Sequence, residues 1–308
     1  MSVDTEEAMG SIPGTVMDDL LKEMKSSGRH WRSLMEDPRH PFLNRKFRWF
    51  TDPKKGMFYR LVTPGQRGTF LDIGAASGIV SACLSEDYER GYALERQQVF
   101  AEFMKLRFQM DSIRNVQILH GSALEIPLPD NSIDLAAVNG VMEWIPHAGK
   151  GTNPRKVQLK FLREVGRCLN PGGKVVIAIE NAWDYQQLSG FSAHGTARYV
   201  GFLPKWLGNI VNIIFKKRPY REYIYSYFGY DRLLKEAGYK NVRIFIVMPD
   251  YYSPVDIYSF DRNALNEFYI KYHSGSRMKR MLKTLSDVFG VPYLWAFFEA
   301  AFYIEAEM

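Results

Sequence analysis

The sequence contains little cysteine and no long apolar run. Only Cys83 and Cys168 occur among 308 residues, and both fall in predicted helices, where we expect buried thiols in a reducing compartment. No apolar run reaches the roughly 18 residues that a membrane span needs. The acidic and polar first residues show no secretory signal, and the chain has no internal repeat or low-complexity tract. We therefore expect a cytoplasmic protein.

The rest of the composition is that of an ordinary globular protein. Hydrophobic residues make up 46% and charged residues 24% of a chain long enough for one large domain or one domain with an added lobe. The formal net charge of +6 permits an anionic partner but does not require one.

A short apolar strand followed by a turn of small residues stands at residues 69–78. Phe70, Leu71 and Ile73 predict a buried strand, and Gly74 and Gly78 bracket the turn. A helix opens at the next residue, so this stretch predicts the first βα unit of a nucleotide-binding α/β sheet. Glycine lets a ligand approach the backbone, and the helix start offers unpaired N–H donors.

The turn does not fit a dinucleotide. The G-x-G-x-x-G fingerprint would need glycine at 74, 76 and 79, whereas the chain has Gly74, Ala76 and Ile79. Asp72 at the strand end would repel a pyrophosphate and would suit an ammonium group. A ligand with an amino-acid tail and a ribose but no phosphate is S-adenosylmethionine (SAM), and residues 71–78 resemble the first motif of the class I SAM-dependent methyltransferases.

Later segments follow the order of that family over roughly residues 55 to 247. Glu95 ends a second strand 23 residues after Asp72, near the spacing at which an acid reaches a ribose diol. The resemblance implies a Rossmann-like, seven-stranded α/β sheet with helices on both faces and SAM as cofactor. It also implies a set of cofactor-binding residues: Asp72, Gly74, Ala76, Gly78, Glu95, Ser122, Ala123 and Asn139. The family commonly has Gly at the place of Ala76 and Asp at that of Ser122, so we expect weakened contacts there.

This pattern predicts four parts. We expect residues 1–54 to form an extension with cover helices. The first 15 or so of these residues are expected to be disordered. Met17, Leu20, Leu21 and Met24 recur at helical spacing and predict a packing helix. Residues 55–180 form the SAM-binding core, residues 181–227 an α-helical, aromatic lid on the acceptor side, and residues 228–308 the end of the sheet and C-terminal helices. Of these, the apolar run 288–304 predicts a docked helix.

The predicted lid suggests an acceptor. Ile179-Glu180-Asn181 and His194-Gly195-Thr196 resemble methyltransferases associated with bacterial surface-glycan and O-antigen synthesis. Methyl transfer to a hydroxyl needs a base, and histidine titrates near working pH. We predict His194 in the lid as that base and His147 as the second choice, with Glu180 and Asp184 as weaker alternatives. The predicted activity is O-methylation of a glycan or other small-molecule acceptor.

Two other functions stay open. A base N-methyltransferase typically carries an Asn/Asp-Pro-Pro-aromatic motif after the fourth strand, and Asn139-Gly140-Val141-Met142 lacks it, which argues against nucleic acid except for ribose methylation. Ala76 and Ser122 leave room for a SAM-fold protein that binds without catalysis. No metal site is predicted, because Glu180-Asn181 alone does not make one.

Residues 203–221 combine an apolar helix with the basic cluster Lys216-Lys217-Arg218. The interpretation that we favour is a helix buried in the lid. The alternative is a helix that lies in a membrane interface, which would make the protein peripheral to the inner membrane face.

Overall fold

The computed structural model describes residues 14–39, 52–62, 68–149, 152–188, 190, 192–272, 277–288 and 293–308. The chain divides into two compact units, of which the first contains residues 1–139, 164–176 and Met308 and the second residues 140–163 and 177–307. The prediction of disorder for the first 15 or so residues falls mostly on residues 1–13, which lie outside the described residues.

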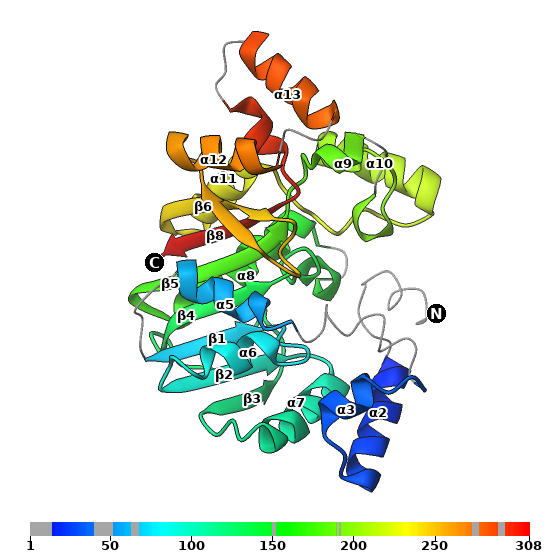
Figure 1. Ribbon diagram of the computed structural model, residues 1–308, viewed down its shortest axis with the longest axis vertical. Helices are drawn as coiled ribbons and strands as arrows, with labels where there is room; N and C mark the ends of the chain where they lie inside the picture. The colour runs from blue at the N-terminus through cyan, green and yellow to red at the C-terminus, as the bar shows by residue number, and fades with distance from the viewer. Residues whose placement is uncertain are drawn as a thin grey trace. The chain divides into compact units, whose positions relative to one another are not determined.

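Strands and helices alternate from α5 to β5, with β3 and β4 consecutive, and helices follow one another before and after that stretch (Figure 1). In order they are α2 (Gly14–Ser27), α3 (Trp31–Met35), α5 (Lys54–Val62), β1 (Thr69–Ile73), α6 (Ile79–Leu84), β2 (Arg90–Glu95), α7 (Gln98–Met110), β3 (Val116–His120), β4 (Ile133–Asn139), α8 (Pro154–Cys168), β5 (Leu169–Glu180), α9 (Tyr185–Leu188), α10 (Lys205–Lys216), α11 (Tyr227–Ala237), β6 (Lys240–Met248), β7 (Asp256–Ser259), α12 (Arg262–Tyr272), α13 (Arg277–Val288) and β8 (Ala301–Glu307).

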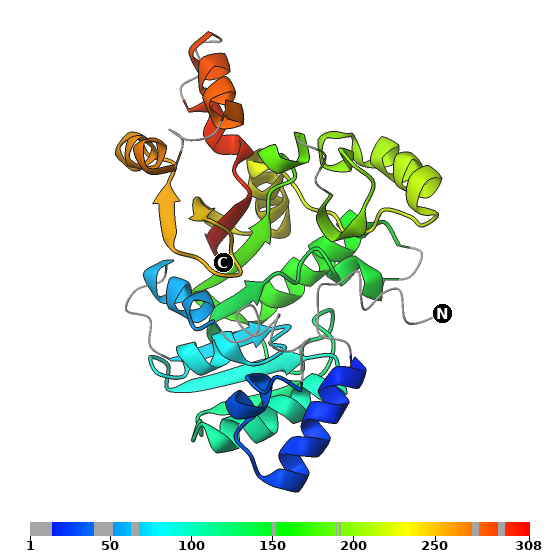
Figure 2. The ribbon, with the colours of Figure 1, turned by 45° about the vertical axis from the view of Figure 1, so that its right-hand side comes forward.

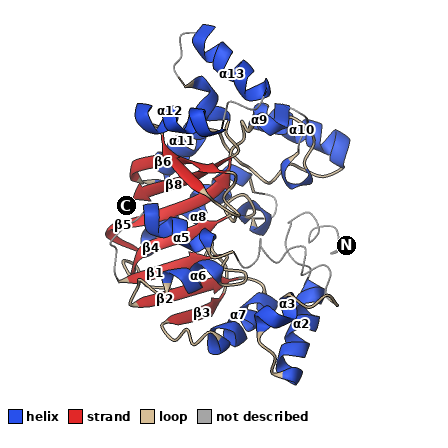
Figure 3. Cartoon of the chain, viewed as in Figure 1, coloured by secondary structure: helices blue, strands red, loops and turns tan. Residues whose placement is uncertain are grey.

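The first unit is built on parallel strands. β1 pairs in parallel with β2 on one side and with β4 on the other, and β3 extends the row beyond β2. Because β1 and β4 are almost continuously buried, they read as short apolar runs instead of alternating patterns. The strand order β3-β2-β1-β4-β5-β8-β6-β7, drawn in red in Figure 3, confirms the predicted α/β sheet, with eight strands instead of seven.

The helix predicted near the N-terminus is a packing helix. Met17, Leu20, Leu21 and Met24 of α2 are buried in one cluster with side chains of α3 and α7, including Trp31, Phe100 and Phe103. Figure 2 shows α2 running beside α7 in the first unit. Cys83 in α6 and Cys168 in α8 are buried free thiols, as predicted.

The second unit contains the antiparallel part of the sheet. β6 pairs antiparallel with β8 and with β7. The prediction of a docked helix over 288–304 is therefore wrong for its last part, because residues 301–307 form β8. Six consecutive residues of β8 are buried, and five of them are apolar. A short, mostly apolar run does not distinguish a strand from a buried helix by its period.

The predicted lid is helical, and it belongs to the second unit. It contains α9, two short 3-10 helices at Ala193–Gly195 and Val200–Phe202, and α10. The interpretation of 203–221 as a buried helix is wrong, because Trp206, Ile210, Ile213, Ile214 and Phe215 are exposed. Among the residues that the structure describes, no helix is long and apolar enough to cross a bilayer. The four predicted domain boundaries and the closing motion of a lid stay predictions.

Candidate functional site

The glycine turn of the first unit is held by its own backbone and by Arg107. The N–H groups of Gly74 and Ala75 donate to the carbonyl of Leu94, at 2.8 and 3.1 Å. The buried Arg107 donates through Nη1 to the carbonyl of Ser77, at 2.6 Å. Gly78 has φ +73°, and a Cβ there would lie 2.8 Å from the ring of Phe108. The turn therefore needs glycine at this place for conformation and for space.

The two acids predicted to hold SAM are both buried, and both are engaged with backbone. Glu95 accepts from the N–H of Ala76 at 3.0 Å and from that of Gln97 at 2.8 Å, so it lies against the turn. Its predicted contact with a ribose diol stays a prediction. Asp72 accepts through Oδ2 from the N–H and the hydroxyl of Ser81, at 2.9 and 2.6 Å. Burial raises the pKa of Asp72 to about 6, although the hydrogen bonds from Ser81 act to lower it. Asp72 therefore also fastens the start of α6, and its contact with an ammonium group stays a prediction.

The other predicted contacts follow β3 and β4. Ser122 accepts from the N–H of Leu124 at 3.2 Å, which ties the loop that contains Ala123. Asn139 ends β4, and its Nδ2 is buried without a hydrogen-bond partner among the described residues. A buried amide donor without a partner is costly unless a ligand satisfies it.

These features fit SAM. Ala76 has φ +46°, a left-handed conformation that favours glycine, which accounts for the glycine common in the family. The turn has small side chains that leave space for a ligand. The Glu95 carboxylate can accept hydrogen bonds from a ribose diol, and the Asn139 amide has one unsatisfied donor. Contacts of individual residues with the cofactor stay predictions.

The second unit gathers a separate set of ionisable side chains. Glu143 lies in the loop after β4, Glu180 is the last residue of β5, and His194 lies in the 3-10 turn with φ +54°. One ligand atom of each, a carboxylate oxygen or an imidazole nitrogen, lies within 4.8 Å of the others. Tyr251 and Tyr252, which follow β6, place their hydroxyls 2.8 and 2.9 Å from Oε1 of Glu180. We call these five residues the acid–histidine cluster.

Several polar atoms of the acid–histidine cluster have no well-aligned partner. Glu143 is fully buried, and neither of its carboxylate oxygens has a hydrogen-bond partner among the described residues. Oε2 of Glu180 is also without one. His194 Nε2 lies 3.4 Å from Oε1 of Glu180, an ion-pair distance without good hydrogen-bond alignment. The ring of Trp144 packs edge-on against the imidazole, with 4.7 Å between centroids.

Burial and mutual charge set the proton positions in the cluster. Burial, followed by the charge of Glu180, raises the pKa of Glu143 to about 8. Burial opposes the charged imidazole, but the carboxylates of Glu180, Glu143 and Glu222 outweigh it and raise the pKa of His194 to about 9. Burial likewise opposes ionisation of Glu180, yet His194 and Tyr251 lower its pKa. At neutral pH, Glu143 therefore holds a proton, and an imidazolium faces the Glu180 carboxylate.

His147, the second predicted base, belongs to a neighbouring network. Its Nε2 lies 3.0 Å from Oε1 of Glu222, which also accepts from Arg218. Burial opposes the charge of Glu222, but these two partners lower its pKa to about 2. Arg218 also donates to the carbonyl of His194, at 2.9 Å. His147 is therefore paired with a carboxylate that stays ionised at neutral pH. It belongs to a different hydrogen-bond network from Glu143.

Sequence reasoning missed three members of the acid–histidine cluster. Glu143, Tyr251 and Tyr252 were not among the predicted site residues. The available signal for Glu143 was an acid within the otherwise apolar stretch 141–146. Asp184, a weaker alternative, instead accepts from the N–H of Gln186 at the start of α9, which is a structural role.

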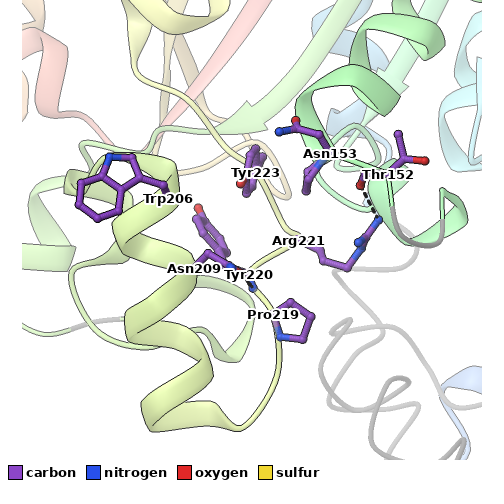
Figure 4. A pocket seen from close by; sticks show the side chains of 9 residues that line it. Thr152, Asn153, Trp206, Asn209, Pro219, Tyr220, Arg221 and Tyr223 are labelled. Atoms are coloured by element: carbon purple, nitrogen blue, oxygen red, sulfur yellow. Dashed lines mark hydrogen bonds between the residues drawn. The ribbon is translucent and has the colours of Figure 1, made fainter.

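A pocket of about 430 Å³ lies in the second unit, beside α10 (Figure 4). Its walls come from residues 152–154, from α10 and from residues 219–223. Trp206, Tyr220 and Tyr223 make it partly aromatic, and Arg221 donates to the carbonyls of Pro146, Gly149 and Thr152.

The comparison with protein families matches part of both units. Residues 71–177 match a family model described as a methyltransferase domain. The matched region contains the glycine turn, Glu95, Ser122, Asn139 and Glu143. Together with the strand order, the match confirms the predicted fold and SAM as the cofactor.

Curated relatives are similar over part of the chain. A demethylmenaquinone methyltransferase of Bacillus mycoides is 24% identical over 59% of this chain and 73% of its own length. One of Listeria welshimeri is 33% identical, but the match spans 20% of this chain and 22% of that protein. A solved SAM-dependent methyltransferase from Aquifex aeolicus covers 90% of this chain and 96% of its own, at 16% identity and a TM-score of 0.44.

Proposed function

We propose that this chain, a class I SAM-dependent methyltransferase by its 71–177 domain, transfers the methyl group of SAM to a hydroxyl of a small-molecule or glycan acceptor. The observation that carries the proposal is the acid–histidine cluster, in which the buried Glu143 carboxyl has no partner of its own. Perturbed, buried ionisable groups in one place favour a catalytic role over a structural one.

The reaction is a displacement at the methyl carbon. The bond from the acceptor oxygen to the methyl carbon forms as the carbon–sulfur bond breaks, and the sulfonium becomes a neutral thioether. The hydroxyl proton needs an acceptor whose pKa lies near working pH. We assign this role to the cluster, in which Glu143 or His194 takes the proton and Glu180 holds the imidazolium.

The assignment refines the predicted base. His194, the first choice, is cationic at neutral pH. Only the small fraction of molecules in which His194 is neutral can accept the proton of the acceptor hydroxyl. Glu143, with a pKa of about 8, is ionised in a larger fraction of molecules. Both roles depend on the same cluster, so removing either group should slow turnover.

Glu143 also lies four residues after Asn139, which ends β4 and is a predicted cofactor contact. The proposal therefore assigns the base to the segment that directly follows β4 in the sequence. Ligand sites of open α/β sheets form at the carboxyl ends of strands, in support of this role.

A second acceptor class is a demethylated quinone. The names of the curated relatives favour it. Such an acceptor also requires loss of a proton, so the same cluster would serve. Nucleic-acid ribose methylation and binding without catalysis lack a comparable supporting feature.

The test is a transfer assay with methyl-labelled SAM and three probes: octyl glucoside, catechol and demethylmenaquinol. We expect label on a hydroxyl oxygen, located by tandem mass spectrometry. His194→Ala and Glu143→Gln should each lower kcat by roughly 10²- to 10⁴-fold while SAM affinity stays within about twofold. His147→Ala is the matched control and should cost less than about tenfold. Label on carbon would favour the quinone class, and full activity of both variants would reject the cluster as the catalytic site.

A further inference from the structure

Helix α10 turns two asparagines, a glycine and Val211 inward and most of its large apolar side chains outward. Gly208 and Asn212 are its buried residues. Asn212 accepts from the N–H of Ala197 at 2.8 Å and donates to the carbonyl of Arg218 at 3.0 Å. Asn209 accepts from the N–H of Tyr220 at 2.9 Å. The helix is thus fastened to the second unit by amide side chains and a glycine contact.

The opposite side is an apolar stripe. Trp206, Ile210, Ile213 and Ile214 recur at helical spacing, so they project from one face. Trp206 is 68% exposed and Ile214 56%, and Phe215 at the helix end is 72% exposed. A globular helix normally turns such residues to the core, so a contiguous exposed set indicates an interaction surface. Figures 1 and 2 both show α10 at the edge of its unit. We call these five residues the α10 face.

The sequence around the α10 face carries basic residues, of which Arg218 is paired with the buried Glu222 and Lys205 donates to the carbonyl of Ile224. Lys216 and Lys217 are exposed at the C-terminal end of the α10 face, and no acidic residue occurs in the sequence between Asp184 and Glu222. Over the same stretch the chain carries a set of cations: Arg198, Lys205, Lys216, Lys217, Arg218 and Arg221. Tryptophan at one end and lysines at the other suit the headgroup region of a bilayer, where aromatic rings and basic side chains concentrate.

We propose that the α10 face docks on the surface of a bilayer that contains anionic lipids. The stripe enters the headgroup and acyl boundary, and Lys216 and Lys217 pair with lipid phosphates. A lipid surface matches this face better than a protein groove does, because the cations flank an apolar stripe with no acidic residue among them.

Docking on a bilayer would restrict the methyl acceptor to molecules that the bilayer holds. This inference about the acceptor rests on the proposed function. Trp206 belongs to the α10 face and also lines the 430 Å³ pocket, whose other walls include Tyr220 and Tyr223. An amphiphile held in the bilayer could place its head in that pocket. The acceptor class is then a membrane-dissolved molecule with a hydroxylated or quinone head.

The experiment is flotation of the full chain with vesicles of phosphatidylcholine, with and without phosphatidylglycerol, in the absence of SAM. Wild type should bind the anionic vesicles. Ile210→Ser/Ile214→Ser should weaken partitioning at least about tenfold. Lys216→Gln/Lys217→Gln should weaken it about fivefold per lysine and reduce its dependence on salt.

The matched control is Val255→Ser/Ile270→Ser, which removes two exposed apolar side chains of the same unit from outside α10. It should bind like wild type, and all variants should keep the thermal unfolding midpoint of wild type. Equal vesicle binding by the α10 variants and wild type, or no binding by wild type, would overturn the proposal. A lipid-free dimer that Ile210→Ser/Ile214→Ser dissociates would assign the face to a second copy. Vesicle binding without any methyl transfer would support the docking surface and reject the proposed function.

Discussion

Replacing Glu143 by glutamine should stabilise the protein progressively as pH rises while it destroys turnover. Glutamine keeps the shape of the side chain and removes its titration. In the folded state Glu143 is fully buried with a pKa of about 8, against 4.5 for an ordinary glutamate. Between these values the folded state binds a proton that the unfolded state has lost, so the free energy of unfolding of wild type falls as pH rises.

The size of the effect follows from linkage. Each pH unit within that window costs about 1.4 kcal/mol, on the order of 4 kcal/mol in total. His194, whose pKa is raised from 6.5 to about 9, loses its stabilising contribution in the same direction over a higher window. Glu143→Gln removes the first dependence and retains the part of the second that Glu180 and Glu222 cause. The difference in unfolding free energy between variant and wild type should therefore grow from about pH 5 to about pH 8.

Urea unfolding of both proteins at about pH 5, 6.5 and 8 measures this difference. Glu236→Gln is the matched control, because Glu236 is an exposed partner of Arg155 and its pKa is lowered by that ion pair. Its offset from wild type should be independent of pH in this range. A Glu143→Gln offset that is also constant would refute the buried titration of Glu143. A stabilised variant with full turnover would refute its catalytic role and leave the electrostatic reasoning intact.

Two further predictions concern the cofactor and metal ions. Glu95→Ala should weaken SAM binding by roughly 1 to 3 kcal/mol in calorimetry, because a ribose diol and the Ala76 N–H both lose an acceptor; the exposed Glu125→Ala is the control, and unchanged affinity would place the ribose elsewhere. Dialysis against EDTA should leave turnover unchanged, because at neutral pH the cationic His194 compensates Glu180 and Glu143 is protonated; activity lost to EDTA and restored by Mn²⁺ would instead make the cluster a cation site.

The first half of the fold follows from local sequence. β1, the glycine turn and α6 lie within residues 69–84, and their character is set by short-range rules: apolar run, small residues, helix start. Gly78 illustrates the limit of that logic. Its positive φ could be expected from a turn, whereas the approach of Phe108, thirty positions away, is visible only in the folded chain.

The catalytic candidates needed the tertiary structure. Four separate loops or strand ends supply Glu143, Glu180, His194 and Tyr251. The spacing of these residues in the sequence does not predict that they lie close together. Their protonation depends on burial and on one another, so the sequence could propose His194 as a base but could not show that Glu180 keeps it charged.

The sequence by itself determined the α/β class, the SAM turn and the presence of an apolar, basic helix at 205–216. Only the tertiary structure decided which side of that helix is buried. Periodicity locates the stripe from Trp206 to Ile214, but a stripe packs inward or outward according to what else is fastened to the helix, here Asn209 and Asn212. The C-terminal run was decided in the same way, because antiparallel pairing with β6 and burial of nearly the whole strand fix residues 301–307 as β8.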